Sequence, residues 1–302
     1  MYPKFPQFVP LTLEDKATIQ LLTHSLPPYS DFNFTSLWSW NVKGLVSYSI
    51  LNGNLVICLT DYLTGLPSYS FCGDQNVHDT AVNLLEYLMA EELTPELKLI
   101  PEICAQGLRT SELDVKADQD NSDYILDIKK LTTYSGSELK PHRNLVTKFN
   151  KLHQAVIRQL ELHQPDLQAE LENFFHRWIA YKQLDQAATA NELTAFKRVF
   201  HLAHDENILG LGLYVNNQLA GFTINEMLPH NYLMIHFEKG EAPAYPGIYQ
   251  VLMQQTAQFF ANKGYQFINY QQDLGLAGLK QNKSSFKPHH FLHKYKVCLK
   301  QA

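Results

Sequence analysis

In the first half of the chain, hydrophobic positions recur with a helical period and then with an alternating one. Thr12-Leu-Glu-Asp15 has the form of a capping box in front of an amphipathic segment. Asn52-Gly53-Asn54 separates two alternating runs and predicts a β-hairpin. The pattern predicts helices after Asp15, at residues 34–41 and 77–90 and after Pro101, and strands at residues 45–51, 55–60, 69–72, 97–100 and 123–128.

The second half shows the same alternation between the two periods. Asn216-Asn217-Gln218 separates a second pair of alternating runs, and Gly264 has the position of a helix C-cap. The pattern predicts helices at residues 138–151, 166–183, 191–204, 247–263 and 274–283, and strands at residues 155–162, 209–215, 219–226, 232–237, 266–270 and 291–299.

Both halves therefore share one order of elements: helix, helix, hairpin, strand, helix, strand, helix, strand. This order is typical of the GNAT acyltransferase fold, although a fold alone does not define a function. We predict an α/β protein of two tandem GNAT-like domains, residues 1–135 and residues 136–302. We expect the halves to meet near residues 130–150 and the working site to lie in the second.

Composition and charge narrow the class of protein. The 302 residues are 45% hydrophobic and 18% charged, which is ordinary for a globular chain and excludes disorder and coiled coil. The formal net charge of −5 argues against a general polyanion binder. Residues 128–158 nevertheless hold seven basic residues and one acidic residue. This segment is either a local phosphate-binding face or a run of solvated lysines.

Cysteine, histidine and hydropathy patterns indicate neither a metal site nor a membrane protein. The four cysteines form no Cys-x-x-Cys pair, and no carboxylate or cysteine completes a zinc set around His289-His290-x-x-His293. The first residues lack the apolar run of a signal peptide, and no stretch reaches the ~20 apolar residues of a membrane span. We expect a cytoplasmic protein with no integral membrane segment.

The segment His236-Phe-Glu238-Lys239 is the richest candidate for chemistry. Strand alternation would place His236 and Glu238 on one face, where they could orient an amine or remove its proton. The alternative is a solvated strand end with a Glu–Lys pair.

Gly247-Ile-Tyr249-Gln250 opens the next helix, where GNAT enzymes hold the pyrophosphate of coenzyme A on backbone N–H groups. The usual pattern there is Gln/Arg-x-x-Gly-x-Gly/Ala, and Tyr249 stands at its second small position. A side chain there would crowd the backbone that approaches pyrophosphate, so we expect weak or no binding of coenzyme A.

Charged side chains near the last helix and between the halves are candidate anion contacts. Lys280 and Lys283 are three residues apart on one helical face and could pair with a phosphate or a carboxylate. Asp273 either caps that helix or borders the site. Arg143, in the segment joining the halves, is either an anion anchor or a surface arginine.

Several separated motifs together resemble one family, the phosphatidylglycerol lysyltransferase C-terminal domain family. They are Asp127…Leu131…Ser135-Gly136…Leu139…Arg143-Asn144…Phe149, His236-Phe-Glu238-Lys239, Gly247-Ile-Tyr249-Gln250, Asn269…Asp273-Leu-Gly275…Gly278-Leu279-Lys280…Lys283-Ser284…Pro288 and Tyr29-Ser-Asp31-Phe-Asn33-Phe34…Trp38…Trp40. The resemblance implies a tandem GNAT-like fold shared with Fem-type transferases, which use aminoacyl-tRNA. Characterised lysyltransferases move an aminoacyl group from tRNA to a membrane lipid.

The resemblance is incomplete at two positions. Gln271 stands where members often carry an acidic residue, and Lys280 where they often carry arginine. We expect no counterpart of the large membrane domain of the lipid enzymes, so a lipid acceptor does not follow from the resemblance.

We therefore predict aminoacyl or acyl transfer from an activated donor to a small-molecule or peptide amine or hydroxyl, by direct attack on the ester carbonyl. Charged tRNA is the favoured donor and acetyl-coenzyme A the less favoured one. An acetyl-coenzyme A-dependent N-acetyltransferase and a non-catalytic ligand-binding protein remain alternatives. The candidate catalytic residues are His236, Glu238, Lys239 and Asp273. The candidate donor or phosphate contacts are Arg143, Gly247, Tyr249, Gln250, Lys280 and Lys283.

Overall fold

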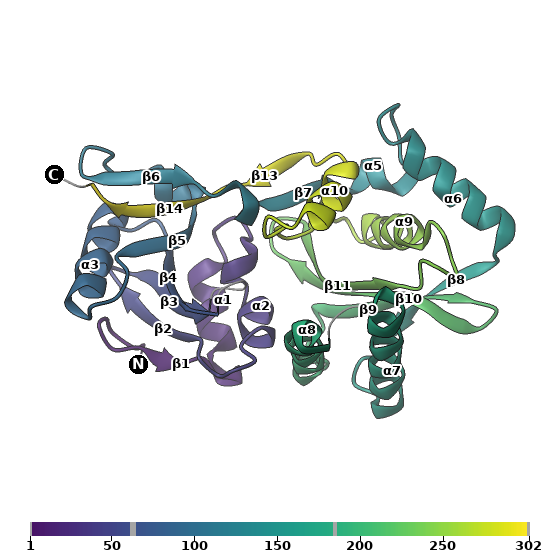
Figure 1. Ribbon diagram of the computed structural model, residues 1–302, viewed down its shortest axis with the longest axis horizontal. Coiled ribbons are helices and arrows are strands. Elements are labelled where there is room, and N and C mark those ends of the chain that lie inside the picture. Colours follow the sequence, from purple (N-terminus) through teal and green to yellow (C-terminus); the bar gives the residue numbers. More distant parts are fainter. Residues whose placement is uncertain (1, 61–64, 184–185, 301–302) are drawn as a thin grey trace. The chain divides into compact units, whose positions relative to one another are not determined.

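The computed structural model describes residues 2–60, 65–183 and 186–300, and these form two seven-stranded sheets with helices packed on them (Figure 1). The chain divides into two compact units. The first is made of Met1–Asp123, Gln272–Ala277 and Phe291–Ala302, and the second of Tyr124–Gln271 and Gly278–His290. The first unit thus includes two segments from late in the sequence. We had predicted that these segments belong to the C-terminal domain.

The sheet of the first unit has the strand order β1-β2-β3-β4-β5-β14-β6. Its strands are β1 (Val9–Pro10), β2 (Ser47–Leu51), β3 (Asn54–Thr60), β4 (Pro67–Cys72), β5 (Glu96–Pro101), β6 (Leu113–Ala117) and β14 (Lys294–Leu299). Its helices are α1 (Lys16–Thr23), α2 (Phe34–Ser39), α3 (Val77–Ala90) and α4 (Glu102–Ala105). The buried leucines of α3, among them Leu84, Leu85 and Leu88, pack against Phe71 and Val297 in one core.

The sheet of the second unit has the order β13-β7-β12-β11-β10-β9-β8. Its strands are β7 (Asp123–Asp127), β8 (Ala155–Leu160), β9 (Ile208–Val215), β10 (Gln218–Leu228), β11 (Tyr232–Gly240), β12 (Phe267–Asn269) and β13 (His290–Leu292). The helices that follow in sequence are α5 (Ile128–Thr133), α6 (Lys140–Leu152), α7 (Pro165–Lys182), α8 (Gln186–Val199), α9 (Ile248–Ala261) and α10 (Ala277–Ser285).

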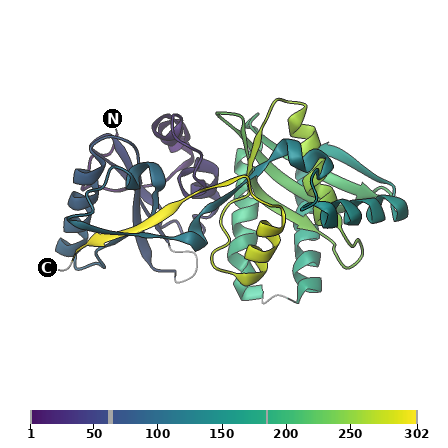
Figure 2. The same cartoon turned by 90° about the horizontal axis from the view of Figure 1, so that it is seen from above.

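The two sheets repeat one plan. In each, three antiparallel strands (β2-β3-β4 and β9-β10-β11) are followed by a parallel neighbour, β5 beside β4 and β12 beside β11. A further antiparallel strand then pairs with this neighbour. It comes from a distant part of the chain both times: β14 pairs with β5, and β7 pairs with β12. Figure 2 shows the C-terminal strand β14 running beside β6. The predicted pair of GNAT-like halves is confirmed.

A buried cluster of charged and polar side chains explains the N-terminal Ser30-Asp31 motif of the first unit. The Lys294 ammonium group donates to Asp31 and to Asp123, at 2.8 Å for the latter. All three side chains are fully buried. Ser30 and Gln272 complete the cluster, with the Ser30 hydroxyl 2.6 Å from both Asp123 Oδ1 and Gln272 Oε1. The cluster fixes the start of β14 inside the first unit.

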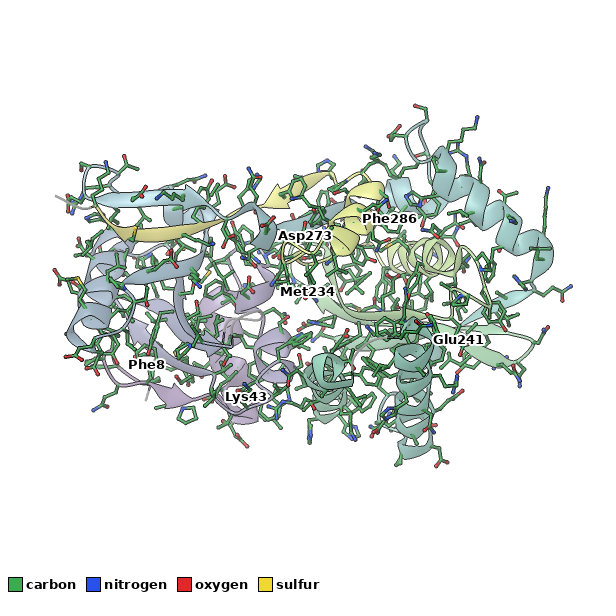
Figure 3. All side chains as sticks on the ribbon, viewed as in Figure 1. Phe8, Lys43, Met234, Glu241, Asp273 and Phe286 are labelled. Carbon is green, nitrogen blue, oxygen red and sulfur yellow. The ribbon has the colours of Figure 1, made fainter. Side chains whose placement is uncertain are left out.

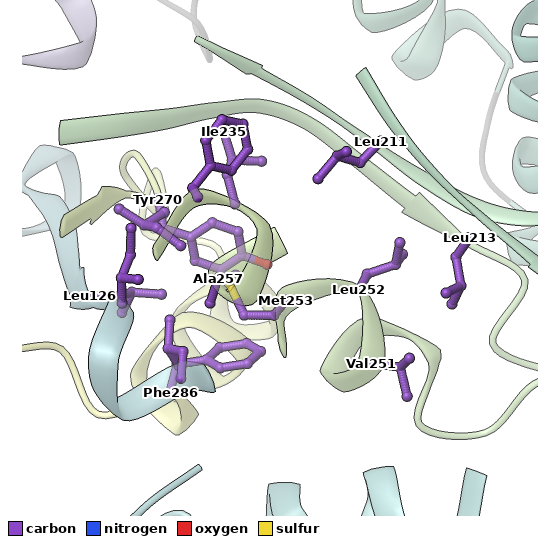
Figure 4. Packing of buried hydrophobic residues seen from close by; sticks show 14 of the residues in the cluster. Leu126, Leu211, Leu213, Ile235, Val251, Leu252, Met253, Ala257, Tyr270 and Phe286 are labelled. Carbon is purple, nitrogen blue, oxygen red and sulfur yellow. The ribbon is translucent and has the colours of Figure 1, made fainter. Parts of the chain in front are cut away.

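In the second unit, helices cover both faces of the sheet. Apolar residues of α5, α6 and α9 form one core with the inward faces of β9 and β11 (Figure 4). On the opposite face, Phe174 of α7 and Phe196 of α8 pack against Phe222 of β10, and Phe196 also packs against Phe237 of β11. The sheet is therefore buried on both sides, and its polar side chains need partners within the unit.

Some predicted elements differ from the structure. The last helix, α10, begins at Ala277 rather than residue 274, and α8 begins at Gln186 rather than residue 191. The short elements β6 and α5 were not predicted. None of the helices in the described ranges has the length and apolar character of a membrane span.

Candidate functional site

The strands β11 and β12 diverge in the middle of the second sheet. They pair in parallel over three positions only, and the last pair is Met234 with Asn269. Met234 is labelled in Figure 3. Beyond it β11 continues to Gly240, whereas β12 has ended. The Gln271 side-chain amide donates to the carbonyl oxygen of Ile235 at 2.7 Å, so a side chain replaces the missing strand there. Beyond Ile235, no strand of the described residues pairs with this edge of β11.

A β-bulge in β11 lies at the same place. On the neighbouring strand β10, Ile224 is opposite Phe237 and Asn225 is opposite Ile235, so His236 is the extra residue. An extra residue reverses the alternation of the side chains that follow it. Ile235 belongs to the core on the α9 side of the sheet. Beyond the bulge, Gly240 again faces α9, because a Cβ added there would lie 2.9 Å from Ile248.

The bulge separates the three candidate residues of β11. Glu238 shares the face of Gly240 and points to the α9 side, whereas Lys239 points to α7 and α8. His236 bonds Glu226 at 2.9 Å, and both side chains are almost completely buried. The predicted common face for His236 and Glu238 is therefore wrong, because simple alternation does not hold across a bulge.

Glu238 keeps one carboxylate oxygen uncommitted. Its Oε2 accepts a hydrogen bond of 2.5 Å from the Tyr270 hydroxyl. Its Oε1 is shielded from solvent and has no hydrogen-bond partner in the part of the chain that the structure describes. Burial raises the pKa of Glu238 from 4.5 to about 7, against the opposing effects of the Tyr270 hydrogen bond and of the Lys239 and Lys283 charges. A carboxyl group with such a pKa can both accept and release a proton near neutrality.

Tyr270 organises the groups around Glu238. It follows β12 directly, and its ring lies in the core beside Phe286 (Figure 4). The Lys283 ammonium group donates to the Tyr270 carbonyl oxygen and lies 4.9 Å from the centre of its ring. Burial, followed by the charge of Glu238, raises the pKa of Tyr270 well above its ordinary value. Tyr270 therefore stays a hydrogen-bond donor to Glu238 at neutral pH.

Two further tyrosines face the charge of Glu238. Burial raises the pKa of Tyr134 and of Tyr249, and the Glu238 charge adds to both shifts. The Tyr134 hydroxyl donates to the carbonyl oxygen of Gln250 at 2.7 Å. The Tyr249 hydroxyl accepts from the Trp178 indole at 3.0 Å and lies 3.3 Å from the Gly240 carbonyl oxygen. Tyr249 is thus a packed side chain of the site, and Gln250 contributes a backbone carbonyl.

Lys239 has partners on the opposite side of the sheet. Its ammonium group bonds Glu192 at 2.6 Å and lies 3.9 Å from the centre of the Trp178 ring and 4.9 Å from that of Phe175. The side chain is almost fully buried. Lys239 ties β11 to α7 and α8, and its charge acts on Glu238 only through space.

Gly247 and Arg143 have structural roles in this geometry. Gly247 is the N-cap of α9 with a φ of +92°, and a Cβ there would lie 3.2 Å from the Leu145 carbonyl oxygen of α6. The Arg143 guanidinium donates to the carbonyl oxygens of Tyr134 and Gly136, at 3.2 Å for the latter. It thereby caps the C-terminal end of α5.

The remaining candidates lie on or before α10. Lys280 is exposed, whereas Lys283 is buried. Asp273 belongs to the first compact unit, where its Oδ1 accepts the Gly275 amide at 2.8 Å. This turn lies ahead of Ala277, so the alternative in which Asp273 caps α10 is wrong. The structure therefore brings Glu238 and Lys283 together with Tyr270, Tyr134 and Tyr249.

Sequence reasoning missed Tyr270, Tyr134 and Trp178. Buried aromatic residues at the ends of predicted elements look like core residues, and nothing in the pattern distinguishes those whose hydroxyl or indole groups complete a site. One signal was present: Tyr270 comes directly after the strand that precedes Asp273. No group of three His, Cys, Asp or Glu side chains that could hold a metal occurs within residues 2–60, 65–183 and 186–300.

The two sheets with diverging parallel strands define a tandem GNAT-like protein. FemX shares this fold over 96% of each chain with a TM-score of 0.56, at 7% sequence identity. The sequence matches the family described as phosphatidylglycerol lysyltransferase, C-terminal, over residues 23–298. The chain belongs to this family.

Individual relatives support the fold. A conserved protein of unknown function from Bacteroides thetaiotaomicron has a TM-score of 0.85 at 24% identity, over 99% of this chain and 100% of that one. L-PGS from Bacillus licheniformis has a TM-score of 0.65 at 13% identity, over 97% and 93%. An uncharacterised protein of Mycoplasmoides gallisepticum is 28% identical over 193 residues, 62% of this chain. The match spans 59% of that relative's length.

Proposed function

We propose that this protein transfers an aminoacyl group from an activated ester to an amine or hydroxyl acceptor, and that Glu238 removes the acceptor's proton. The observation that carries the proposal is the Glu238 carboxylate on β11, beyond the point where the pairing with β12 ends. Its Oε1 is buried without a partner among the described residues, and burial raises its pKa to about 7. A base of this pKa suits proton transfer at neutral pH.

The reaction that we propose needs no covalent enzyme intermediate. The acceptor nitrogen or oxygen attacks the ester carbonyl, and its proton moves to Glu238 Oε1. The bond between the carbonyl carbon and the donor oxygen then breaks, and the departing alkoxide takes the proton back from Glu238. Lys283 supplies positive charge beside this path, because it is held 4.9 Å from the ring centre of the tyrosine that bonds Glu238.

Family membership supports an aminoacyl donor over an acetyl donor. The family is described by a lysyltransferase activity, and FemX shares the fold. We propose aminoacyl-tRNA as the donor, a small molecule or peptide as the acceptor, and the cytoplasm as the location. Acetyl-coenzyme A is less well supported. The backbone of α6 lies where a side chain at Gly247 would point, so Gly247 has a structural reason that does not involve a pyrophosphate.

A transfer assay tests this proposal. Transfer RNA charged with radiolabelled amino acids is incubated with the protein and with mixed small-molecule and peptide acceptors, and labelled products are separated from free amino acid. We expect product with wild-type protein and a loss of about 10²- to 10⁴-fold with Glu238→Gln, the range of general-base catalysis. Glu206→Gln, at an exposed position of the same unit, is the control for loss of one charge.

Two results would contradict the proposal. One is full transfer activity in Glu238→Gln. The other is protein that turns over acetyl-coenzyme A in a parallel reaction but transfers no amino acid from any charged tRNA. Binding of charged tRNA without turnover in the wild type would favour the non-catalytic alternative.

A further inference from the structure

A second buried oxygen without a hydrogen-bond partner lies on the strand next to Glu238. It belongs to Asn225 of β10, whose side chain is fully buried. The Asn225 amide nitrogen donates to the Leu209 carbonyl oxygen at 3.1 Å and to the Thr223 hydroxyl at 2.9 Å. Its Oδ1 is shielded from solvent and has no hydrogen-bond partner in the described part of the chain. A buried amide oxygen without a donor is costly, so this position indicates a donor that comes from a ligand.

The orientation of the Asn225 amide follows from its neighbours. The Leu209 carbonyl oxygen can only accept a hydrogen bond, so the group that faces it is the NH₂ of Asn225. Leu209 belongs to β9, which pairs with one edge of β10, and β11 pairs with the other edge. The oxygen and nitrogen of a planar amide point to opposite sides. The Asn225 oxygen is therefore turned away from β9 and toward β11, the strand of Glu238.

Asn225 and Glu238 share one face of the sheet. Thr223 is directly opposite Glu238 in the register of β10 and β11, and such pairs share a face with Cβ atoms about 5 Å apart. On β9, the residues opposite Thr223 and Asn225 are Leu211 and Leu209, and both belong to the core on the α9 side (Figure 4). The Asn225 amide thus bonds the residue that stands opposite Glu238, and the two oxygens without partners lie on the same side of adjacent strands.

Two hydrogen-bond acceptors on one face need two donors from the group that lies between them. A primary amine has two N–H groups and keeps its lone pair for attack on a carbonyl carbon. A hydroxyl group has one O–H, so it can satisfy Glu238 or Asn225 but not both. A bound hydroxyl would leave one buried acceptor unpaired, and sites of this kind discriminate strongly against a group that lacks the donor.

We propose that Asn225 selects a primary amine as the acceptor, by accepting the N–H group that Glu238 does not take. This inference rests on the proposed function and narrows its acceptor. The amine donates one N–H to Glu238 Oε1 and the other to Asn225 Oδ1, and its lone pair forms a bond with the ester carbonyl carbon. Glu238 takes the first proton and passes it to the donor oxygen when the bond between carbon and that oxygen breaks. The second N–H stays on the nitrogen, so the product is an amide.

Binding of three small probes tests the proposal without turnover. n-Butylammonium, n-butanol and butyltrimethylammonium share one alkyl chain and offer three, one and no hydrogen-bond donors. Each is titrated against the full chain at pH 8, where Glu238 is ionised, and binding is measured by the rise in melting temperature. We expect n-butylammonium to bind at least about tenfold more tightly than the other two, and butyltrimethylammonium controls for positive charge.

A pair of matched variants assigns this preference to Asn225. Asn225→Leu keeps the size of the side chain and removes its oxygen, so it should weaken n-butylammonium binding about tenfold, the effect of one lost hydrogen bond. Thr256→Val removes another buried hydroxyl on the α9 side and should bind n-butylammonium as the wild type does. The comparison of the three probes on wild-type protein needs neither variant to fold.

The transfer assay with charged tRNA separates this inference from the proposed function. With n-butylamine and n-butanol as acceptors, we expect a labelled amide that survives incubation at pH 10, which hydrolyses esters. Transfer that yields only alkali-labile esters would overturn the amine inference and leave acyl transfer standing. Equal binding of the three probes would also overturn it and assign the Asn225 oxygen to a buried water. Asn225-dependent binding of n-butylammonium without transfer from any charged tRNA would contradict the proposed reaction and support the amine site.

Discussion

Replacing Glu238 by glutamine should stabilise the protein at high pH. The pKa of Glu238 is about 7 in the folded state and 4.5 ordinarily. Below pH 4.5 the carboxyl is protonated in both states, so it costs nothing. Between pH 4.5 and 7 the unfolded chain releases this proton and the folded protein retains it, so wild-type stability falls as pH rises. Above pH 7 the full penalty of a buried charge is present, and glutamine avoids it.

The size of the effect follows from the interval between the two pKa values. One pKa unit corresponds to about 1.4 kcal/mol, so the penalty above pH 7 is about 3 kcal/mol. Glutamine keeps an oxygen that can accept from Tyr270, so the hydrogen bond of the Tyr270 hydroxyl survives. Relative to wild type, Glu238→Gln should therefore gain about 3 kcal/mol in unfolding free energy between pH 4 and pH 8.

Calorimetric melts at pH 5 and pH 8 measure this effect without a known substrate. We expect Glu238→Gln to melt close to wild type at pH 5 and above it at pH 8, by about 6–12 °C for a unit of this size. Glu206→Gln, which removes an exposed carboxylate, should change little at either pH. The reasoning is refuted if the melting temperature of Glu238→Gln does not exceed that of wild type and if the difference between the two is the same at pH 5 and at pH 8.

Three other substitutions test further features of the structure. Tyr270→Phe removes a donor that favours the charged form of Glu238, so it should steepen the loss of melting temperature between pH 5 and pH 8; an unchanged slope would contradict this. Lys294→Met leaves Asp31 and Asp123 buried without a cation and should cost about 3–5 kcal/mol in urea unfolding. Gly247→Ala imposes a side chain at a φ of +92° and should cost about 1–2 kcal/mol; wild-type stability would argue against the close approach of Leu145.

The sequence predicted the repeated order of elements because most of that order is local. Helical and alternating periods, hairpin turns and caps all depend on residues within or next to each element. The exchange of β7 and β14 between the two sheets is different. Strand pairing across more than a hundred residues leaves no mark on local periodicity. The buried pairing of Lys294 with Asp31 and Asp123 could not be foreseen for the same reason.

The site was predictable in part. Glu238 and Lys283 were selected as charged residues in strand-end and helix positions, and their charges interact in the structure. The bulge at His236 could not be read from alternation, so His236 was assigned to the face of Glu238, and this was wrong. Gly247 and Arg143 were read as ligand contacts, whereas packing against α6 and capping of α5 explain both. The sequence alone does not distinguish a glycine or an arginine that contacts a ligand from one that packs against a helix or caps it.

The pKa of the Glu238 carboxyl itself is the most direct measure of the site. Carbon-13 NMR of protein labelled at the glutamate side-chain carboxyl gives a titration curve for each carboxyl, and the signal absent from Glu238→Gln identifies Glu238. Our account predicts a midpoint near pH 7 for this signal, the effect of burial at the open edge of β11. A midpoint near 4.5 would show a solvated carboxylate and would contradict the assignment of Glu238 as the base.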